Sequence, residues 1–190
     1  FLFFHAGVVK ALWSEGLLPG ILSGSSGGSV VSAMVCTNRD EDLGPFFEPE
    51  QLAREYENEE GQTLFNPLGM AKRMSQLQVK ERLEEILPDL TFQEAYELTG
   101  RHLNVSVAPA EKHQNGRLLK AITSPNVFVR EAVLASCAVP GIYEPVALMA
   151  KDHTGKRVPY LPGRKWVDGS VTHDIPTKRL SRLYGVNHHI

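Results

Sequence analysis

The fold of this chain is decided by residues 19–35, which read PGILSGSSGGSVVSAMV. A short apolar strand at 21–22 runs into glycines and serines, and a helix of small residues follows. Inside this stretch, Ser26 has a glycine two positions before it, Gly24, and another two positions after it, Gly28. The Gly-x-Ser-x-Gly spacing is typical of a sharp strand-to-helix turn that presents a nucleophilic serine.

Such a turn needs small residues for a mechanical reason. A serine at the apex has a strained backbone, and its neighbours must lack a Cβ so that strand and helix can approach each other. The turn also directs the first amides of the helix toward the charge that develops on a substrate carbonyl. A plain linker loop has a similar composition, but a phosphate loop of the Walker type needs a lysine directly after its last glycine, and Ser29 follows Gly28. The motif alone leaves the nucleophile and the linker loop open.

Composition restricts the remaining function classes. A chain of 190 residues that is 42% hydrophobic and 22% charged is typical of one globular domain with a substantial core. The net charge of −2 gives no case for nucleic acid. Cys36 and Cys137 lie in apolar helical stretches without metal-ligand spacing, so we expect buried reduced thiols. The histidines are scattered, and we expect neither a metal nor a cofactor.

The two ends of the chain resemble interior sequence. Phe1 already lies in a passage from strand to helix, and residues 186–190 read as a strand that is just beginning. We therefore expect one domain over residues 1–190, truncated at both ends, with any anchor or targeting signal outside it. No apolar run approaches the roughly 20 residues of a membrane span.

Helical and strand patterns alternate along the chain, which favours a mostly parallel sheet with helices on both faces. We expect strands at 21–22, 102–108, 118–123, 146–150 and 166–167, and helices at 1–13, from 27 to about 38, and at 64–87, 91–100, 129–138 and 176–183.

A helical insertion of about residues 40–99 follows the helix after the serine turn. Residues 40–60 carry nine acidic side chains against one basic side chain, which indicates a solvated helix. Residues 64–87 are amphipathic, with a stripe of Met and Leu that is more typical of a core than of a lipid-facing surface. An insertion at this place in the chain suits a lid over a substrate.

A nucleophilic serine needs a neighbouring base, and Asp168 stands in a suitable context. It lies between the apolar strand end at 166–167 and Gly169, which lets the backbone turn and expose the carboxylate. A purely structural aspartate at a strand-end turn is the alternative. A catalytic triad would instead use a histidine that follows the acid. The histidines that follow Asp168 are His173, His188 and His189.

Two motifs together give a resemblance. Gly24-Ser25-Ser26-Gly27-Gly28 combined with Asp168-Gly169-Ser170 resembles the patatin-like phospholipase family. The stretches 5–12 and 135–145 are similar to its first helix and to a segment that packs near its active site. The resemblance covers nearly the whole chain. The stretches most similar to the triacylglycerol lipase branch of fungi, plants and some bacteria are 17–19 and 186–190.

The resemblance implies a three-layer α/β/α fold and hydrolysis of lipid acyl esters. It implies Ser26 as nucleophile and Asp168 as base, a dyad without histidine that acts through an acyl-serine. The family's glycine-rich oxyanion loop precedes the first helix, so the oxyanion donors are expected mainly upstream of residue 1, with the Gly27 backbone as a donor within the chain. Ser170 stands where the family usually has alanine or glycine.

Triacylglycerol is the substrate that the resemblance favours. The alternatives are a phospholipase A or lysophospholipid acyltransferase, a non-catalytic lipid-surface protein, and a malonyl-transferase-like enzyme that relies on histidine. We expect the partner to be a lipid substrate at a membrane or lipid-droplet surface inside the cell, no nucleic acid, and no specified protein partner. Basic residues outnumber acidic ones over 151–182 and could contact anionic lipid.

Overall fold

A mixed β-sheet forms the centre of the molecule. The computed structural model describes residues 2–48, 74–111, 114–171 and 175–190. The long strand β2 (His102–Pro109) pairs with three shorter strands, β1 (Ile21–Gly24), β3 (Arg117–Leu119) and β6 (Trp166–Asp168). A separate hairpin consists of β4 (Met149–Lys151) and β5 (Arg157–Pro159).

The register of the sheet brings β1 and β6 together. Val105 of β2 pairs with both β1 and β3, and Val107 pairs with both β3 and β6, so β1 and β6 share one edge of β2 while β3 occupies the other. β1 runs parallel to β2 and ends opposite Val105, whereas β6 runs antiparallel and ends opposite Val107. The carboxyl ends of β1 and β6 therefore meet beside Ser106.

The expectation of a mostly parallel sheet is wrong. Among the described strands only the β1–β2 pair is parallel, while β2–β3, β2–β6 and β4–β5 are antiparallel. A parallel neighbour needs a crossover connection of a dozen or more residues, and β3 begins too soon after β2 for one. Two expected strands are also displaced: β3 ends at Leu119, and β4 begins at Met149, with Val146 forming a single bridge to Trp166.

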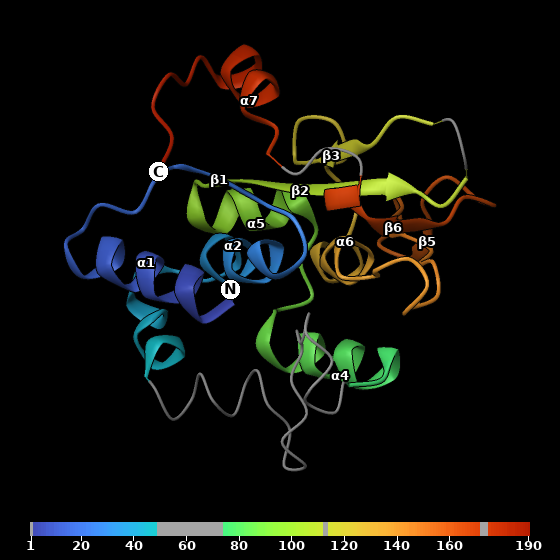
Figure 1. The fold of residues 1–190 in the computed structure, drawn as a ribbon, viewed down its shortest axis with the longest axis horizontal. Coiled ribbons are helices and arrows are strands. Elements are labelled where there is room, and N and C mark those ends of the chain that lie inside the picture. Colours follow the sequence, from blue (N-terminus) through green and yellow to red (C-terminus); the bar gives the residue numbers. More distant parts are fainter. Residues whose placement is uncertain (1, 49–73, 112–113, 172–174) are drawn as a thin grey trace.

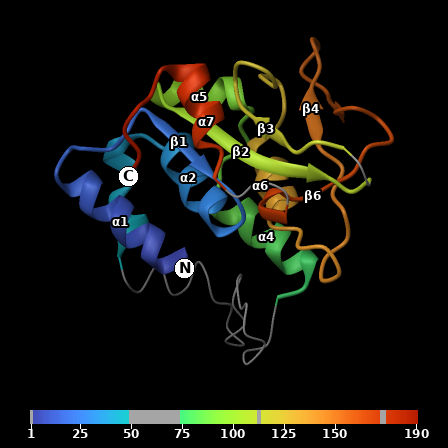
Figure 2. The same cartoon turned by 45° about the horizontal axis from the view of Figure 1, so that its top comes forward.

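Helices cover both faces of this sheet, which confirms the three-layer α/β/α fold (Figures 1 and 2). α2 (Gly27–Thr37), α5 (Phe92–Thr99) and α6 (Val129–Ser136) pack on one face, and α7 (Thr177–Tyr184) lies over the other. α1 (Leu2–Ser14) packs against α2, and α4 (Gln76–Ile86) packs against α6.

The serine helix α2 lies at the heart of the core. Every residue from Ser29 to Thr37 is buried, which its small side chains permit because neighbouring helices can approach closely. Cys36 in α2 and Cys137 beyond α6 are both buried and free, as expected. Burial raises the pKa of the Cys36 thiol to about 12, although Arg101 nearby opposes the shift.

The region of the expected insertion is only partly described. Residues 40–48 form two short 3₁₀ helices, η1 (Asp40–Asp42) and η2 (Gly44–Phe47), instead of one solvated helix. These residues are not fully solvated, because Phe47 of η2 is buried against Trp13 of α1. Of the expected helix over 64–87, the structure describes residues 74–87, and within them the helix is α4. The rest of this prediction, residues 49–73, lies outside the described residues.

Caps define the ends of the next helices. Ser75 and Gln78 form a capping box at the start of α4, and Thr91 and Glu94 form the expected one at the start of α5. α5 ends at Gly100, which has a positive φ of 70°.

Within the described residues, no helix is both long enough and apolar enough to cross a membrane.

Candidate active site

Ser26 forms the apex of the turn between β1 and α2. Its backbone has φ 51° and ψ −127°, a conformation that costs a non-glycine residue on the order of 1–3 kcal/mol. The N–H of Ser26 donates to Oγ of Ser136 at 3.0 Å, and that hydroxyl donates to the Ser106 carbonyl at 2.8 Å. The carbonyl of Ser26 accepts from the N–H and the hydroxyl of Ser29. The strained turn is thus held by α6, β2 and its own helix.

The two outer glycines of the motif differ in whether packing requires glycine at their position. A Cβ on Gly24 would overlap the carbonyl group of Gly28, so the close approach of strand and helix requires glycine at that position. A Cβ on Gly28 would meet no described atom within 4 Å. The expectation that both neighbours must lack a Cβ therefore holds for Gly24 and is wrong for Gly28.

Asp168 ends β6 beside this turn. Asp168 is 3% exposed, and its N–H donates to the Ala138 carbonyl at 3.0 Å. A Cβ on the next residue, Gly169, would lie 2.5 Å from the Ser106 carbonyl carbon, so only glycine lets the chain leave the sheet here. η3 (Gly169–Val171) follows directly.

The carboxylate of Asp168 contacts the serine motif through Ser25. Oγ of Ser25 donates to Oδ1 of Asp168 at 3.2 Å across 143 residues of sequence, and the N–H of Ser170 donates to the same oxygen at 2.9 Å. Among the described residues, the Ser26 hydroxyl makes no hydrogen bond to Asp168. The structure therefore brings the two predicted motifs together, with the direct link made by the residue before Ser26.

Ser136 and Cys137 lie under the turn. The resemblance placed the stretch 135–145 near the active site, but it gave neither residue a role in holding the turn. Both are buried, and Sγ of Cys137 donates to the Ser26 carbonyl at 3.7 Å. Burial raises the pKa of the Cys137 thiol well above its usual range, and the negative charge of Asp168 adds to the shift. A single sequence carries no spacing signal for either residue, because α6 is distant from both motifs along the chain.

The first amide of α2 is available to a ligand. The N–H of Gly28 donates to the Ser25 carbonyl and that of Ser29 to the Ser26 carbonyl. Within the described part of the chain, the N–H of Gly27 donates to no acceptor. Gly27 is also the residue after Ser26, the position that supplies an oxyanion donor in a nucleophile turn of this kind.

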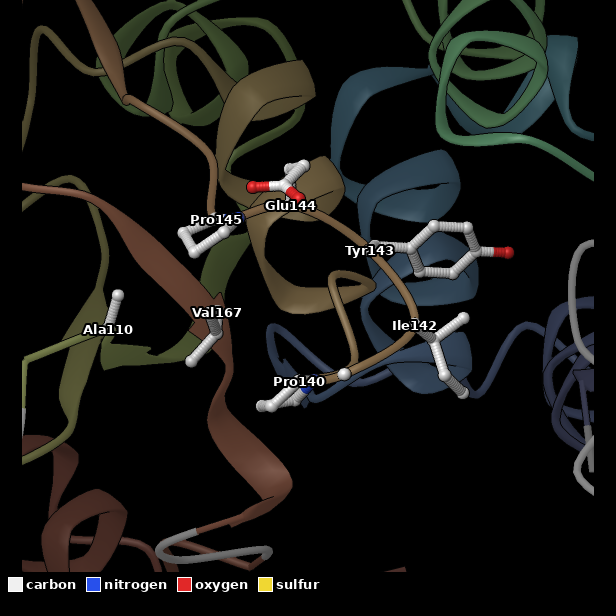
Figure 3. A pocket seen from close by; sticks show the side chains of 8 residues that line it. Ala110, Pro140, Ile142, Tyr143, Glu144, Pro145 and Val167 are labelled. Atoms are coloured by element: carbon white, nitrogen blue, oxygen red, sulfur yellow. The ribbon is translucent and has the colours of Figure 1, made fainter.

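A cavity of about 340 Å³ lies on the side of β6 next to the Asp168 turn. Figure 3 shows that Pro140, Val167 and Ala110 face one hollow, whereas Ile142 and Tyr143 point to the other side of their loop. The lining is mixed polar and apolar, and one of its residues, Val167, directly precedes Asp168 in the chain. The complete lining consists of Ala110, Pro140, Gly141, Ile142, Tyr143, Glu144, Pro145 and Val167.

The described histidines that were considered as bases lie away from this site. His188 and His189 are exposed in the last residues of the chain, and His173 lies outside the described residues. His102 stacks between Tyr96 and Tyr184, with ring centroids at 4.5 and 4.9 Å. In the described ranges, no three His, Cys, Asp or Glu side chains gather into a metal-binding group.

Comparisons with known proteins identify the family of the chain. The family model described as patatin-like phospholipase matches residues 2–180, and the chain therefore belongs to the patatin-like phospholipase family. It is 42% identical over 205 residues to triacylglycerol lipase SDP1L of Arabidopsis thaliana, covering 98% of this chain and 25% of that protein. It is 38% identical over 197 residues to triacylglycerol lipase ptl2 of Schizosaccharomyces pombe, covering 98% of this chain and 30% of that one.

The chain thus spans between a quarter and a third of the length of these two relatives. Among solved structures, VipD from Legionella pneumophila aligns with a TM-score of 0.49 and 15% identity, covering 92% of this chain and 45% of that chain.

Proposed function

We propose that this chain is the acyl-ester hydrolase domain of a triacylglycerol lipase, with Ser26 as nucleophile and Asp168 as general base. The observation that carries the proposal is the contact between the strained serine turn and a buried aspartate from the other end of the chain. Family membership supports the ester chemistry, and the names of two relatives support triacylglycerol as the substrate.

The first step is acylation of Ser26. Its Oγ attacks the ester carbonyl carbon while its proton passes to the Asp168 carboxylate. The negative oxygen of the tetrahedral intermediate is stabilised by the Gly27 N–H and by the dipole at the start of α2. When the intermediate collapses, the ester C–O bond breaks and the alcohol leaves with the proton from Asp168.

The second step releases the fatty acid. Water loses a proton to Asp168 and attacks the acyl carbon, and Ser26 leaves as the hydroxyl after taking that proton back. The same carboxylate therefore serves both half-reactions. The cavity beside β6, lined in part by Val167 and Pro140, offers room for part of an acyl chain.

An insoluble substrate requires an interface, so we place the activity at the surface of a membrane or lipid droplet inside the cell. The basic residues of 151–182 support this only in part. Lys151 pairs with Glu94, and Arg157 pairs with Asp89 and Glu131, so those two charges are already neutralised within the protein. Lys156 and Lys165 are exposed and remain the better candidates for contact with anionic lipid.

The test is a lipid panel on the full-length protein together with a fluorophosphonate, which labels activated serines. We expect release of fatty acid from emulsified triolein, labelling of the wild type, and loss of both in Ser26→Ala and Asp168→Asn. Ser14→Ala, on the exposed end of α1, is the matched control and should behave as wild type.

Faster hydrolysis of phosphatidylcholine vesicles than of triolein would reassign the substrate to phospholipids. Acyl transfer to a lysophospholipid would identify an acyltransferase. A folded wild-type protein that is neither labelled nor active would contradict the enzyme assignment and favour a lipid-surface protein. Normal labelling of Asp168→Asn with loss in His173→Ala would favour a base of the histidine type.

A further inference from the structure

We propose that Ser25 is a positioning residue of this site, whose hydroxyl holds the Asp168 carboxylate in the orientation that the Ser26 hydroxyl needs. This role rests on the proposed function, since it gives Ser25 a part in activating Ser26. It adds a residue to the site that the Gly-x-Ser-x-Gly pattern treats as variable.

The hydrogen bonds of the carboxylate carry the argument. Ser25 Oγ and the Ser170 N–H both donate to Oδ1 of Asp168, at 3.2 and 2.9 Å. Among the described residues, Oδ2 accepts no hydrogen bond. Two donors on one oxygen fix the rotation of the carboxylate about its last bond and leave the other oxygen to take the proton of the nucleophile.

Burial makes this orientation dependent on protein groups. Asp168 is only 3% exposed, so few water molecules can replace a lost donor. Hydrogen bonds to a charged group stabilise it more than neutral ones do, and the contribution of one such bond corresponds to about 10- to 100-fold in an equilibrium or a rate. The loss of one of the two described donors should therefore lower the rate of proton transfer from Ser26 to Asp168.

The turn itself places the Ser25 hydroxyl. The carbonyl of Ser25 accepts the Gly28 N–H at 3.0 Å, and the close approach of Gly24 to the helix fixes the residue before it. The hydrogen bond from Ser25 is the direct side-chain link between the turn and Asp168 that the structure describes. It consequently couples the position of β6 to the position of the nucleophile.

Ser25 also has to be distinguished from a nucleophile, because a hydroxyl bonded to a carboxylate could itself attack an ester. Its neighbour has the features of the elbow: Ser26 has the positive φ, and the free Gly27 amide follows it. The positioning role thus predicts slower labelling when Ser25 is replaced and no labelling when Ser26 is replaced.

The experiment compares Ser25→Ala, Ser25→Thr and Ser25→Cys with Ser26→Ala in the full-length protein. The readouts are kcat and KM on emulsified triolein and the rate of fluorophosphonate labelling. For Ser25→Ala we expect kcat and the labelling rate to fall by about 10- to 100-fold, with KM unchanged. Ser25→Thr keeps the hydroxyl and should retain wild-type kcat to within a few-fold. Ser26→Ala should not be labelled.

A wild-type kcat in Ser25→Ala would overturn the role, and so would an equal loss in Ser25→Ala and Ser25→Thr, because the hydroxyl would then not be the cause. If Ser25→Ala fails to fold, Ser25→Cys provides the test, since a thiol fills the space but is a weak donor; wild-type kcat in that variant would likewise exclude the role. Labelling that persists in Ser26→Ala and disappears in Ser25→Ala would make Ser25 the nucleophile. An unlabelled and inactive wild type would instead refute the proposed function, and this role with it.

Discussion

Gly24 and Gly28 approach each other so closely that a methyl group on Gly24 would overlap the Gly28 carbonyl, whereas a methyl group on Gly28 would meet no described atom within 4 Å. The two glycines of the motif are therefore unequal. The first glycine is required by packing, while the second lies in the first turn of α2, where a larger residue has room.

This asymmetry predicts opposite results for two identical substitutions. Gly24→Ala forces strand and helix apart, which we expect to cost about 3 kcal/mol and to lower the melting temperature by roughly 6–12 °C, with loss of fluorophosphonate labelling. Gly28→Ala should melt as the wild type does. Equal melting temperatures for the two variants, measured by circular dichroism, would contradict the packing explanation.

The strain at Ser26 predicts a trade of activity for stability. Ser26→Gly and Ser26→Ala both remove the proposed nucleophile, but glycine adopts a positive φ freely and alanine does not. We expect Ser26→Gly to be more stable than Ser26→Ala by about 1 kcal/mol in urea unfolding, with both variants inactive. If Ser26→Ala were the more stable of the two, the turn would not be strained.

Ser136 should matter for both stability and chemistry. Its hydroxyl accepts from the Ser26 N–H and donates to the Ser106 carbonyl, so Ser136→Ala leaves two backbone groups without their partner. We expect the free energy of unfolding to fall by about 2–4 kcal/mol and the labelling rate of the folded protein to fall as well. Ser14→Ala, in the exposed last turn of α1, provides the control and should change stability by less than about 0.5 kcal/mol. A Ser136→Ala protein as stable as this control would exclude the anchoring role.

His102 gives the fold a dependence on pH. Burial lowers its pKa below the ordinary value, and Tyr96 and Tyr184 stack on its ring. Because its pKa is lower in the folded state, His102 binds a proton more readily in the unfolded state. Its contribution to the free energy of unfolding is therefore complete above about pH 6.5, and it is lost as the pH falls through the lower folded-state pKa. We expect the urea midpoint to fall between pH 7 and pH 5.

His102→Phe keeps an aromatic ring in the stack but cannot take up a proton, and it should reduce this fall. The same change at His153, in an exposed turn, should leave the pH dependence as it is in the wild type. An identical pH dependence in wild type and His102→Phe would assign the effect to other groups.

Local signals in the sequence were sufficient for much of the fold. The serine turn, the capping box at Thr91 and the glycine that ends α5 all appear where the residue pattern predicts them. Each of these features is determined by a few adjacent residues, because caps and tight turns depend on local hydrogen bonds and on glycine.

Features that depend on distant pairing could not be predicted in the same way. The direction of β6 follows from its register with β2, which no short pattern encodes. The sequence predicted that Asp168 lies at the turn where a strand ends. Its contact with Ser25, however, depends on two strands meeting end to end. The resemblance placed the stretch 135–145 near the site, but the hydrogen bond from Ser26 to Ser136 could not be predicted, since α6 reaches the turn only after the sheet has formed.

The meeting of β1 and β6 beside Ser106 has a consequence for synthesis of the protein. The two halves of the site lie 143 residues apart in sequence and are joined only when β6 is added to β2. A ribosome that has released residues up to 160 has already exposed the Ser26 turn, but without any carboxylate to deprotonate it. With Asp168 as the base, a chain that has not yet been synthesised through β6 cannot cleave lipid, and the ability to do so arises only when β6 joins β2.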